Sequence, residues 1–365
     1  MVNSGKNSFE GTTVFLDADI YFPAEPLTPM DYFTPIGNNT VGFFKGTFDG
    51  QGHIINNLAF NTSYQYAGLF GYSGYGLTIR NVIMGKSCSI TSSFSSGSSY
   101  MGGILGQCTP RNAQCNIENS INMGDLAFGG SMSDQESYLG GIAGYFHLYE
   151  IRNAVVKNCA NYGRITDTSI TDDSYIGGIV GHFYQYKYER GYIRNCLNYG
   201  DIRHNGRTMS YLTIGGITGW IYYGTIENCV SAGKISGSLS TAKYNFIGSL
   251  IGYVGNSVSA GYCHWGSDIG VNRAVGSGTL AQALETSLSI FNSALVSSLN
   301  NRSSINNWNK WLLNSNRSTI TFHMNNNKGF SLSSELILLP SLAIGDSLMF
   351  NDWFTDPYYE EPFQL

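Results

Sequence analysis

The chain has 365 residues and a formal net charge of −5, and only 12% of its residues are charged, against roughly 25% in a typical domain. Gly is abundant at 45 residues and Tyr at 25, whereas Pro is scarce at 8. This composition favours a β-rich scaffold over a helical enzyme. It gives no basic footprint for nucleic acid, and the sequence has no apolar run long enough to predict a membrane span.

Residues 1–65 are expected to form an N-terminal cap and a first coil. The start of the chain lacks the charged and then apolar pattern of a secretory signal, so either export uses another route or the chain is a mature or excised piece. Residues 14–20 alternate as in a half-buried strand. Gly46–Leu58 places a Gly-rich turn before a short apolar strand.

Residues 66–276 contain six copies of one Gly-rich strand, of which Tyr175–His182 is the clearest. The copies recur at intervals of 33 to 38 residues, which indicates a repeat architecture. The neighbouring Gly residues permit close approach of layers or a bend. One aliphatic residue per copy should stack into a core ladder: Leu69, Ile104, Ile142, Ile179, Ile217 and Leu250.

A second element follows each strand and carries asparagine at one position: Asn81, Asn119, Asn158, Asn195 and Asn228. Asn tolerates left-handed backbone at sharp bends, and stacked amides can bond along the array. No repeat contains a helical period, which excludes leucine-rich, ankyrin and TPR arrays. The pattern predicts an all-β chain that forms a parallel β-helix, right-handed by the general crossover preference.

The stretch Gly46–His53 (GTFDGQGH), then Tyr66–Tyr72 (YAGLFGY) and the repeated GGIxG and NCxNxG elements resemble the GLUG-motif proteins. The stretch Gly261–Gly266 (GYCHWG) resembles the last coil of that family. The resemblance covers about Val14 to Trp311. It implies a β-helical repeat protein of bacterial or protist surfaces, used for adhesion or surface display and sometimes set beside an enzyme domain. It brings no catalytic residues.

Residues 277–312 are expected to hold a capping helix. Apolar residues recur at helical spacing over 279–299, with Thr279 as a candidate cap and Asn300 as the stop. We expect this helix to cover the open C-terminal end of the solenoid, and a dimer seam is the alternative. Residues 313–365 predict a tail of strands and irregular structure. The helical stripe is Leu280, Leu284, Leu288, Phe291, Leu295 and Leu299, with Trp308 and Trp311 adding apolar area.

The loops that leave the Gly-rich strands vary most between repeats and are rich in aromatic residues. Stacked coils would place these loops on one flank, and such insertions often form a binding face. Rings with a polar tip suit sugars and protein partners; alternatively, the loops pack on each other or on the coil. The predicted binding residues are Tyr145, Phe146, Tyr149, Phe183, Tyr184, Tyr186, Tyr188, Trp220, Tyr222 and Tyr223.

The seven cysteines do not predict a zinc site, because they lack paired CxxC motifs. Stacked buried thiols are the better interpretation for one cysteine in each of several repeats. Cys108 and Cys115 flank a short loop and could form a disulfide in an oxidising environment.

The sequence offers little for catalysis. Carbohydrate-cleaving β-helices place acidic residues together on one outer face, whereas the acids here fall in different loops: Asp167, Asp172, Asp173 and Glu189. His182 and His204 stand singly, and His53 lies in a family-like turn. No nucleophile elbow, HExxH or P-loop motif occurs.

We therefore expect a non-enzymatic extracellular or cell-surface β-helix that acts as an adhesin or binding scaffold, without catalytic residues, metal or cofactor. Its partner would be a protein or glycan on a host or neighbouring surface. One alternative is a structural subunit of a filament or particle that self-associates. A second alternative is a carbohydrate-active enzyme, either a polysaccharide lyase or a hydrolase.

Overall fold

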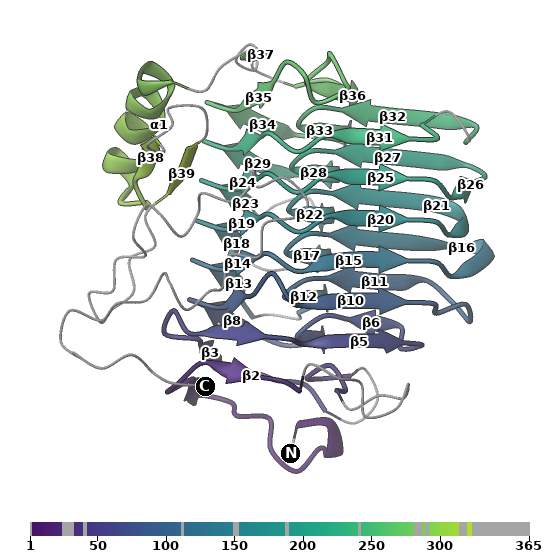
Figure 1. Cartoon of the computed structure of the whole chain (residues 1–365), viewed down its shortest axis with the longest axis vertical. Coiled ribbons are helices and arrows are strands. Elements are labelled where there is room, and N and C mark those ends of the chain that lie inside the picture. Colours follow the sequence, from purple (N-terminus) through teal and green to yellow (C-terminus); the bar gives the residue numbers. More distant parts are fainter. Residues whose placement is uncertain are drawn as a thin grey trace.

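A computed structural model describes residues 2–23, 33–38, 42–110, 113–148, 153–186, 190–239, 242–280, 287–288, 292–313 and 320–322. The chain winds into a right-handed parallel β-helix of about 6 turns, which confirms the predicted fold class. Figure 1 shows the coils stacked along the long axis, with the N-terminal strands at one end and β36 near the other. No described helix is long and apolar enough to cross a membrane.

Each complete coil contributes one strand to each of five parallel sheets, numbered here in the order in which the chain visits them. The first sheet contains β1 (Thr13–Phe15), β3 (Thr47–Asp49), β8 (Leu77–Arg80), β13 (Cys115–Glu118), β18 (Asn153–Lys157), β23 (Arg190–Arg194), β29 (Gly224–Glu227) and β34 (Val258–Gly261). The second contains β2 (Ile20–Tyr21), β4 (Ile54–Asn56), β9 (Ile83–Met84), β14 (Ile121–Asn122), β19 (Ala160–Asn161), β24 (Leu197–Asn198), β30 (Val230–Ser231), β35 (His264–Gly266) and β37 (Ser287–Leu288).

The other three sheets complete the coil. The third contains β5 (Ala59–Thr62), β10 (Ser89–Ser92), β15 (Asp125–Phe128), β20 (Ile165–Asp167), β25 (Ile202–His204) and β31 (Ile235–Gly237). The fourth contains β6 (Tyr66–Ala67), β11 (Ser99–Gly102), β16 (Ser131–Gly140), β21 (Ile170–Gly177), β26 (Arg207–Thr208), β27 (Tyr211–Gly215) and β32 (Tyr244–Gly248). The fifth contains β7 (Phe70–Ser73), β12 (Leu105–Cys108), β17 (Ala143–Leu148), β22 (Val180–Gln185), β28 (Thr218–Tyr222), β33 (Ile251–Val254) and β36 (Val275–Ser277).

The core is filled by residues that repeat in register from coil to coil. The six aliphatic ladder residues named above are all buried, at the bend between the fourth and fifth sheets. Cys159, Cys196, Cys229 and Cys263 are free, fully buried thiols, and burial raises the pKa of Cys196, Cys229 and Cys263 well above the ordinary value. They act as small apolar groups.

The asparagine ladder marks the bend between the first and second sheets. All five residues have left-handed backbone, with φ between 49° and 56°, which Asn tolerates better than most residues. Each amide donates to the equivalent residue of the preceding coil over 2.7 to 3.2 Å, from Asn228 down to Asn119 and Asn81. Asn81 in turn donates to Asp49 over 2.8 Å. The stack of amides therefore satisfies buried polar groups along the axis, except for Oδ1 of Asn228 at its C-terminal end.

The helix α1 (Ser293–Asn306) begins and ends later than predicted. Its N-cap is Asn292, whose side chain accepts from the Leu295 N–H over 3.0 Å, and Asn307 closes it with left-handed backbone. Of the predicted stripe, Leu280 packs against the coil core and Leu288 lies in β37. Leu284 and Phe291 fall outside the described residues. At Ser287–Leu288 the chain therefore forms a short strand of the second sheet and not the predicted helix.

The predicted position of the helix is also wrong. In Figure 1, α1, β38 (Trp311–Leu313) and β39 (Ile320–Phe322) lie at the side of the coils and not across their C-terminal end. Leu295, Leu299 and Trp311 cluster with the outward residues Leu197 and Val230 of the second sheet. The physical reason is that this sheet is apolar on its outer face, which must be covered.

Candidate functional site

The predicted aromatic flank lies largely on the strands β17, β22 and β28, not in loops. Successive side chains of a strand point to opposite faces. Phe146 and Phe183 point into the core and are fully buried, so their assignment to a binding surface is wrong. The other described members lie outside that core: Tyr145, Tyr184, Trp220 and Tyr222 on the strands, and Tyr186 and Tyr223 just beyond them. Tyr149 and Tyr188 fall outside the described residues.

Of these outward residues, Tyr145 and Trp220 belong to one of two neighbouring rows of side chains in register. The row on the fifth sheet is Tyr72, Gln107, Tyr145, His182, Trp220 and Tyr253. The row on the fourth sheet is Tyr66, Tyr100, Tyr138, Tyr175, Thr213 and Phe246. We call the two rows together the aromatic corner. No residue of the second row was among the predicted binding residues, although a ring stands at the first position of most copies of the Gly-rich strand.

The two rows meet because the bend between the sheets is sharp. A Cβ on Gly140 or Gly177 would lie 1.9 Å from the carbonyl oxygen of Ala143 or Val180, so no side chain fits there. Rings of both sheets therefore stack across the bend. The ring centroids are 4.5 Å apart for Tyr138–Tyr145 and 5.0 Å apart for Tyr175–His182.

In the middle coils the rings of the aromatic corner cover each other. Tyr100 and Tyr138 stack at 4.9 Å with an angle of 3° between their planes, and Tyr138 and Tyr175 stack at 4.9 Å and 12°. Tyr138, Tyr145, Tyr175 and His182 are only 5–8% exposed. Most of each ring face is thus covered by a neighbouring ring and is not exposed to solvent.

Two carboxylates border these middle rings from neighbouring strands. Glu136 accepts from the Tyr138 hydroxyl over 2.5 Å. Asp173 accepts from the Tyr175 hydroxyl over 2.9 Å and from the Tyr211 N–H over 2.9 Å. Burial, together with the neighbouring carboxylates, raises the pKa of Tyr138, of Tyr175 and of Asp173. Neither phenol is therefore suited to act as a phenolate base near neutral pH.

His182 lies among these rings with both ring nitrogens buried and without a hydrogen-bond partner. Its centroid is 5.0 Å from Tyr145 and from Tyr175 and 5.6 Å from Trp220. Burial, with a smaller contribution from His147, lowers the pKa of His182 to about 3. Burial likewise lowers the pKa of His147 to about 4. His182 in the corner and His147 beside it are therefore neutral imidazoles at physiological pH.

Toward the C-terminal coils the stack opens. Thr213 interrupts the fourth-sheet row, and Trp220 packs on Tyr253 at 4.2 Å with a 40° tilt. Tyr211 and Tyr244, which lie two positions before Thr213 and Phe246 on β27 and β32, stack with their ring centroids 4.9 Å apart. Tyr244 is 39% exposed. We call the partly exposed rings of this region the aromatic platform, formed by Tyr211, Trp220, Tyr244, Phe246 and Tyr253.

A His–Asp pair lies elsewhere, inside the coil. His204 Nδ1 is 2.8 Å from Asp167 Oδ2, and both side chains are fully buried. Asp167 also accepts from the Ser169 and Ser174 hydroxyls over 2.6 and 3.0 Å. Burial alone would raise the pKa of Asp167, but His204 and Ser169 lower it overall. Because no substrate can reach this network, its role is structural.

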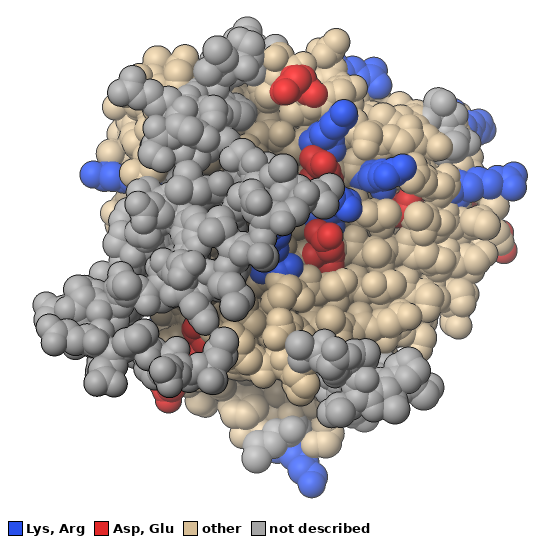
Figure 2. Space-filling model, in the orientation of Figure 1, with Lys and Arg blue, Asp and Glu red and all other residues tan. Residues whose placement is uncertain are grey.

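A row of charged residues follows the outer face of the first sheet, and most of its charges are paired. Arg80 lies 2.8 Å from Asp49, Lys157 lies 3.1 Å from Glu118, and Arg194 lies 3.3 Å from Glu227. Figure 2 shows basic and acidic side chains interleaved on one face of the molecule. This row is therefore close to neutral.

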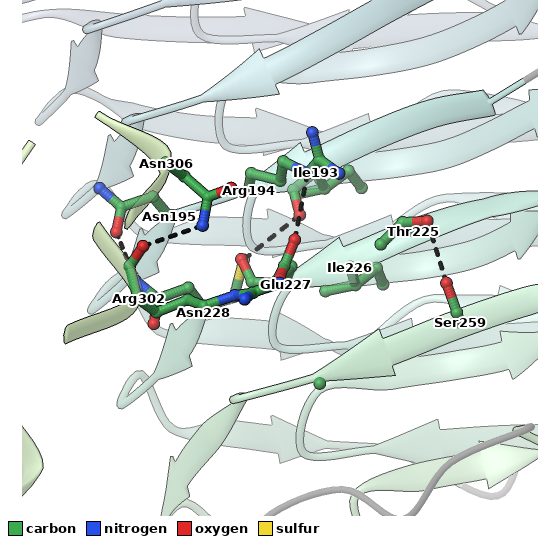
Figure 3. Close-up of polar contacts among 12 residues, drawn as sticks. Ile193, Arg194, Asn195, Thr225, Ile226, Glu227, Asn228, Ser259, Arg302 and Asn306 are labelled. Carbon is green, nitrogen blue, oxygen red and sulfur yellow. Dashed lines mark hydrogen bonds and ion pairs between the residues drawn. The ribbon is translucent and has the colours of Figure 1, made fainter. Parts of the chain in front are cut away.

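The C-terminal segment is bound to the coils beside that row. Arg302 of α1 pairs with Glu227, and Asn228 donates to the Leu299 carbonyl over 3.3 Å. Asn195 accepts from the Ser303 hydroxyl over 3.0 Å and from the Trp311 indole N–H over 2.6 Å. Figure 3 shows Arg302 beside Glu227 and Asn228. The asparagine ladder is thus covered by the chain itself.

Cys108 and Cys115 form a disulfide that closes the loop between β12 and β13. Within the described ranges, no group of three or more His, Cys, Asp or Glu side chains is arranged to hold a metal ion. The remaining acids of the sequence analysis are divided: Asp167 is buried, Asp172 and Asp173 lie on β21, and Glu189 falls outside the described residues.

No family model matches the chain, and no curated protein matches it. Its fold is similar to a crystal structure from Bacteroides ovatus described as a "putative immunoglobulin A1 protease". The TM-score is 0.60 at 19% sequence identity, and the match covers 87% of this chain and 88% of the other. At this identity the likeness supports the β-helical fold alone.

Proposed function

We propose that the chain is a non-enzymatic β-helical binding scaffold, placed at a cell surface or outside the cell, that holds an extended ligand along the aromatic corner. The observation that carries this proposal is the aromatic platform. There, Trp220 is tilted against Tyr253, and Tyr244, which stacks on Tyr211, keeps 39% of its surface exposed. Partly exposed rings with polar tips are typical of binding surfaces.

An oxidising location is supported by the cysteines. The disulfide between Cys108 and Cys115 is of a kind that persists mainly outside the cytosol. The free cysteines are all buried and so protected from exchange. The resemblance to GLUG-motif proteins implies the same placement and an adhesive role.

A non-enzymatic role is supported by how the acids are used. Glu136 and Asp173 are bonded to tyrosine hydroxyls, and the Asp167–His204 pair is fully buried. The name of the Bacteroides neighbour supplies one activity to test, which is cleavage of immunoglobulin A1. The purified chain should leave that protein intact over a prolonged incubation, and specific cleavage would overturn the non-enzymatic proposal.

Binding is tested with a pair of matched variants on glycan and surface-protein arrays. Tyr244→Gln changes the platform, whereas Tyr21→Gln changes another exposed tyrosine, on the N-terminal strand β2. We expect Tyr244→Gln to weaken binding of array ligands by roughly tenfold, the effect of losing about 1.4 kcal/mol, and Tyr21→Gln to leave it unchanged. Equal binding by both variants and the unaltered chain would overturn the proposed site.

A further inference from the structure

We propose that the outer face beneath the C-terminal segment is an interface between two copies of this chain. The C-terminal segment is residues 292–313 and 320–322, which hold α1, β38 and β39. In the proposed dimer, the segment of each copy lies on the coils of the other, in the place where it lies on its own coils in Figure 1. The inference is independent of the aromatic platform and of what binds there.

The segment is attached to the coils from outside and belongs to none of their sheets. Among the described strands, β38 pairs with β39 alone, in an antiparallel sheet separate from the five parallel sheets. Its apolar residues Leu295, Leu299 and Trp311 pack in a cluster distinct from the interior core. The segment can therefore leave the surface without breaking a strand pair of the coils or exposing their interior.

The asparagine ladder is complete without the segment. Asn195 donates to Asn158 over 2.8 Å and accepts from Asn228 over 2.7 Å. Both bonds join coil to coil and need no atom of the segment. The contacts to the segment are added to these bonds, so the coils keep a preorganised binding surface when the segment is absent.

That surface binds the backbone and one large side chain of the segment. The Asn309 N–H donates to Asn158 Oδ1 over 3.3 Å, and the Asn309 carbonyl accepts from Asn195 over 3.0 Å. The Trp311 indole N–H donates to Asn195 Oδ1 over 2.6 Å, and Trp311 is fully buried. A buried tryptophan whose N–H is satisfied is typical of the residues that contribute most to an interface.

Charge complementarity fixes the position of α1 on the same surface. The Glu227 side chain is 8% exposed, lies 3.3 Å from Arg194 and also pairs with Arg302 of α1 (Figure 3). The Arg302 guanidinium lies over the Tyr262 ring, 4.9 Å from its centroid. An occupant of this surface must thus present an arginine, a tryptophan and a free backbone amide and carbonyl at the spacing found here. The C-terminal segment has that chemistry, and a second copy of the chain offers it identically.

Exchange between copies keeps these contacts and changes only which coils the segment lies on. The balance between the closed monomer and the exchanged dimer therefore depends on protein concentration, as in domain swapping. A short connection at the hinge favours exchange, and here β37 ends at Leu288 while the N-cap of α1 is already Asn292. An exchanged dimer carries two aromatic platforms, which strengthens attachment to a repetitive surface by avidity.

The test mixes two full-length variants, Glu227→Cys and Arg302→Cys, at several protein concentrations and at a temperature just below the onset of unfolding. Neither variant has the ion pair between these positions in its own chain. An exchanged heterodimer restores that pair at one of its two sites and places the two introduced cysteines together at the other. A short bismaleimide then joins them, and the resulting 227–302 link, identified by peptide mass spectrometry, can form only between chains. The native free cysteines are all buried and protected from the reagent.

Two controls assign the link to the proposed surface. In a second mixture, Ser304→Cys takes the place of Arg302→Cys, because Ser304 is exposed and residues two positions apart do not share a helix face. The double variant, with Glu227→Cys and Arg302→Cys in one chain, should link within the monomer and so shows that the reagent reaches both positions. Light scattering on each sample gives the fraction of dimer.

We expect the 227–302 link and a dimer fraction that rises with concentration and is roughly fivefold higher in the mixture than in either variant alone, the effect of about 1 kcal/mol. A mixture that stays monomeric and unlinked, while the double variant links within one chain, would show that the segment closes only on its own coils and would overturn the proposal. Equal linking through Ser304→Cys, or no link in the double variant, would overturn the surface itself. None of these variants changes a ring of the aromatic corner, so the array experiment with Tyr244→Gln decides the proposed binding function separately.

Discussion

Two outer flanks of this β-helix are both built from residues that repeat in register, but one flank is covered by the C-terminal segment and the other stays partly exposed. On the asparagine flank, Asn195 and Asn228 bond to α1 and to the residues that follow it, so the chain covers its own ladder. On the aromatic corner, the middle rings cover each other, whereas platform residues such as Trp220 and Tyr253 remain partly exposed. The asparagine ladder is covered by the chain itself and so contributes to stability, whereas the other flank keeps part of its aromatic surface exposed, and the proposed binding rests on that exposed surface.

Asn195 offers the largest expected effect on the covered flank. Replacing it with Ala removes the acceptor of the buried Trp311 indole N–H and one hydrogen bond from each of the Asn158 and Asn228 side chains, and it places Ala at φ 51°. We expect a loss of about 3–5 kcal/mol in the free energy of unfolding, measured by chemical denaturation. Asn195→Gly is the control, because Gly also removes the side-chain amide but adopts the left-handed backbone conformation at this position without strain. It should recover roughly 1 kcal/mol, and wild-type stability in Asn195→Gly would show that the amide stack contributes nothing.

Leu299 tests whether the covering segment and the coils are one unit. It is buried against the second sheet, so Leu299→Ala should cost about 2–4 kcal/mol. Ile305 lies in the same helix but is 76% exposed, and Ile305→Ala should change stability by about 0.5 kcal/mol or less. Hydrogen exchange shows where the loss falls. If faster exchange is confined to α1 and β38, the segment opens without the coils; faster exchange throughout the solenoid means that flank and cover unfold together.

The period of the repeat made the interior predictable. Leu69 and its equivalents had to stack once the copies were aligned, and Asn81 and its equivalents were placed at bends because few other residues accept left-handed backbone there. The cover was harder to place. The outer face of the second sheet is apolar at Ile121, Leu197 and Val230, directly after the asparagine elements, and that pattern was a signal that a helix should lie there and not at the end of the solenoid.

The aromatic corner was predicted only in half. Tyr145 and Phe146 are adjacent in the sequence, and deciding which of them faces outward requires knowing that β17 continues past the Gly bend. The partner ring, Tyr138, lies seven positions earlier, and only the bend at Gly140 brings the two together. The aromatic residue types predicted a binding surface. Which rings lie together on that surface depends on the bend at Gly140, and the spacing of residues in the sequence does not show that bend.

The corner should respond to acid and the asparagine flank should not, because the ladder is made of amides. The pKa of His182 is about 3 in the folded chain and about 6.5 when unfolded, so the unfolded chain takes up the proton first. The stability that depends on neutral His182 is complete above about pH 7 and is lost as the pH falls from 6.5 toward 3. At about pH 4.5 the loss is about 2–3 kcal/mol.

His182→Gln isolates that contribution, because Gln107 occupies the same row two coils away. The difference in free energy of unfolding between the two proteins should be constant above about pH 7 and should change as the pH falls toward 4.5, because only the wild type takes up this proton on unfolding. We expect the variant to have a flatter acid limb. Parallel curves down to about pH 4.5 would show that the imidazole is not held neutral in the corner.

The smallest expected effect lies in the paired charges of the first sheet. Lys157 and Glu118 are 31% and 24% exposed, so Lys157→Gln should cost about 0.5 kcal/mol or less in the free energy of unfolding, and less still at high salt. Chemical denaturation at low and at high salt measures this cost. An equal cost under both conditions would show that the ion pair contributes nothing through its charge.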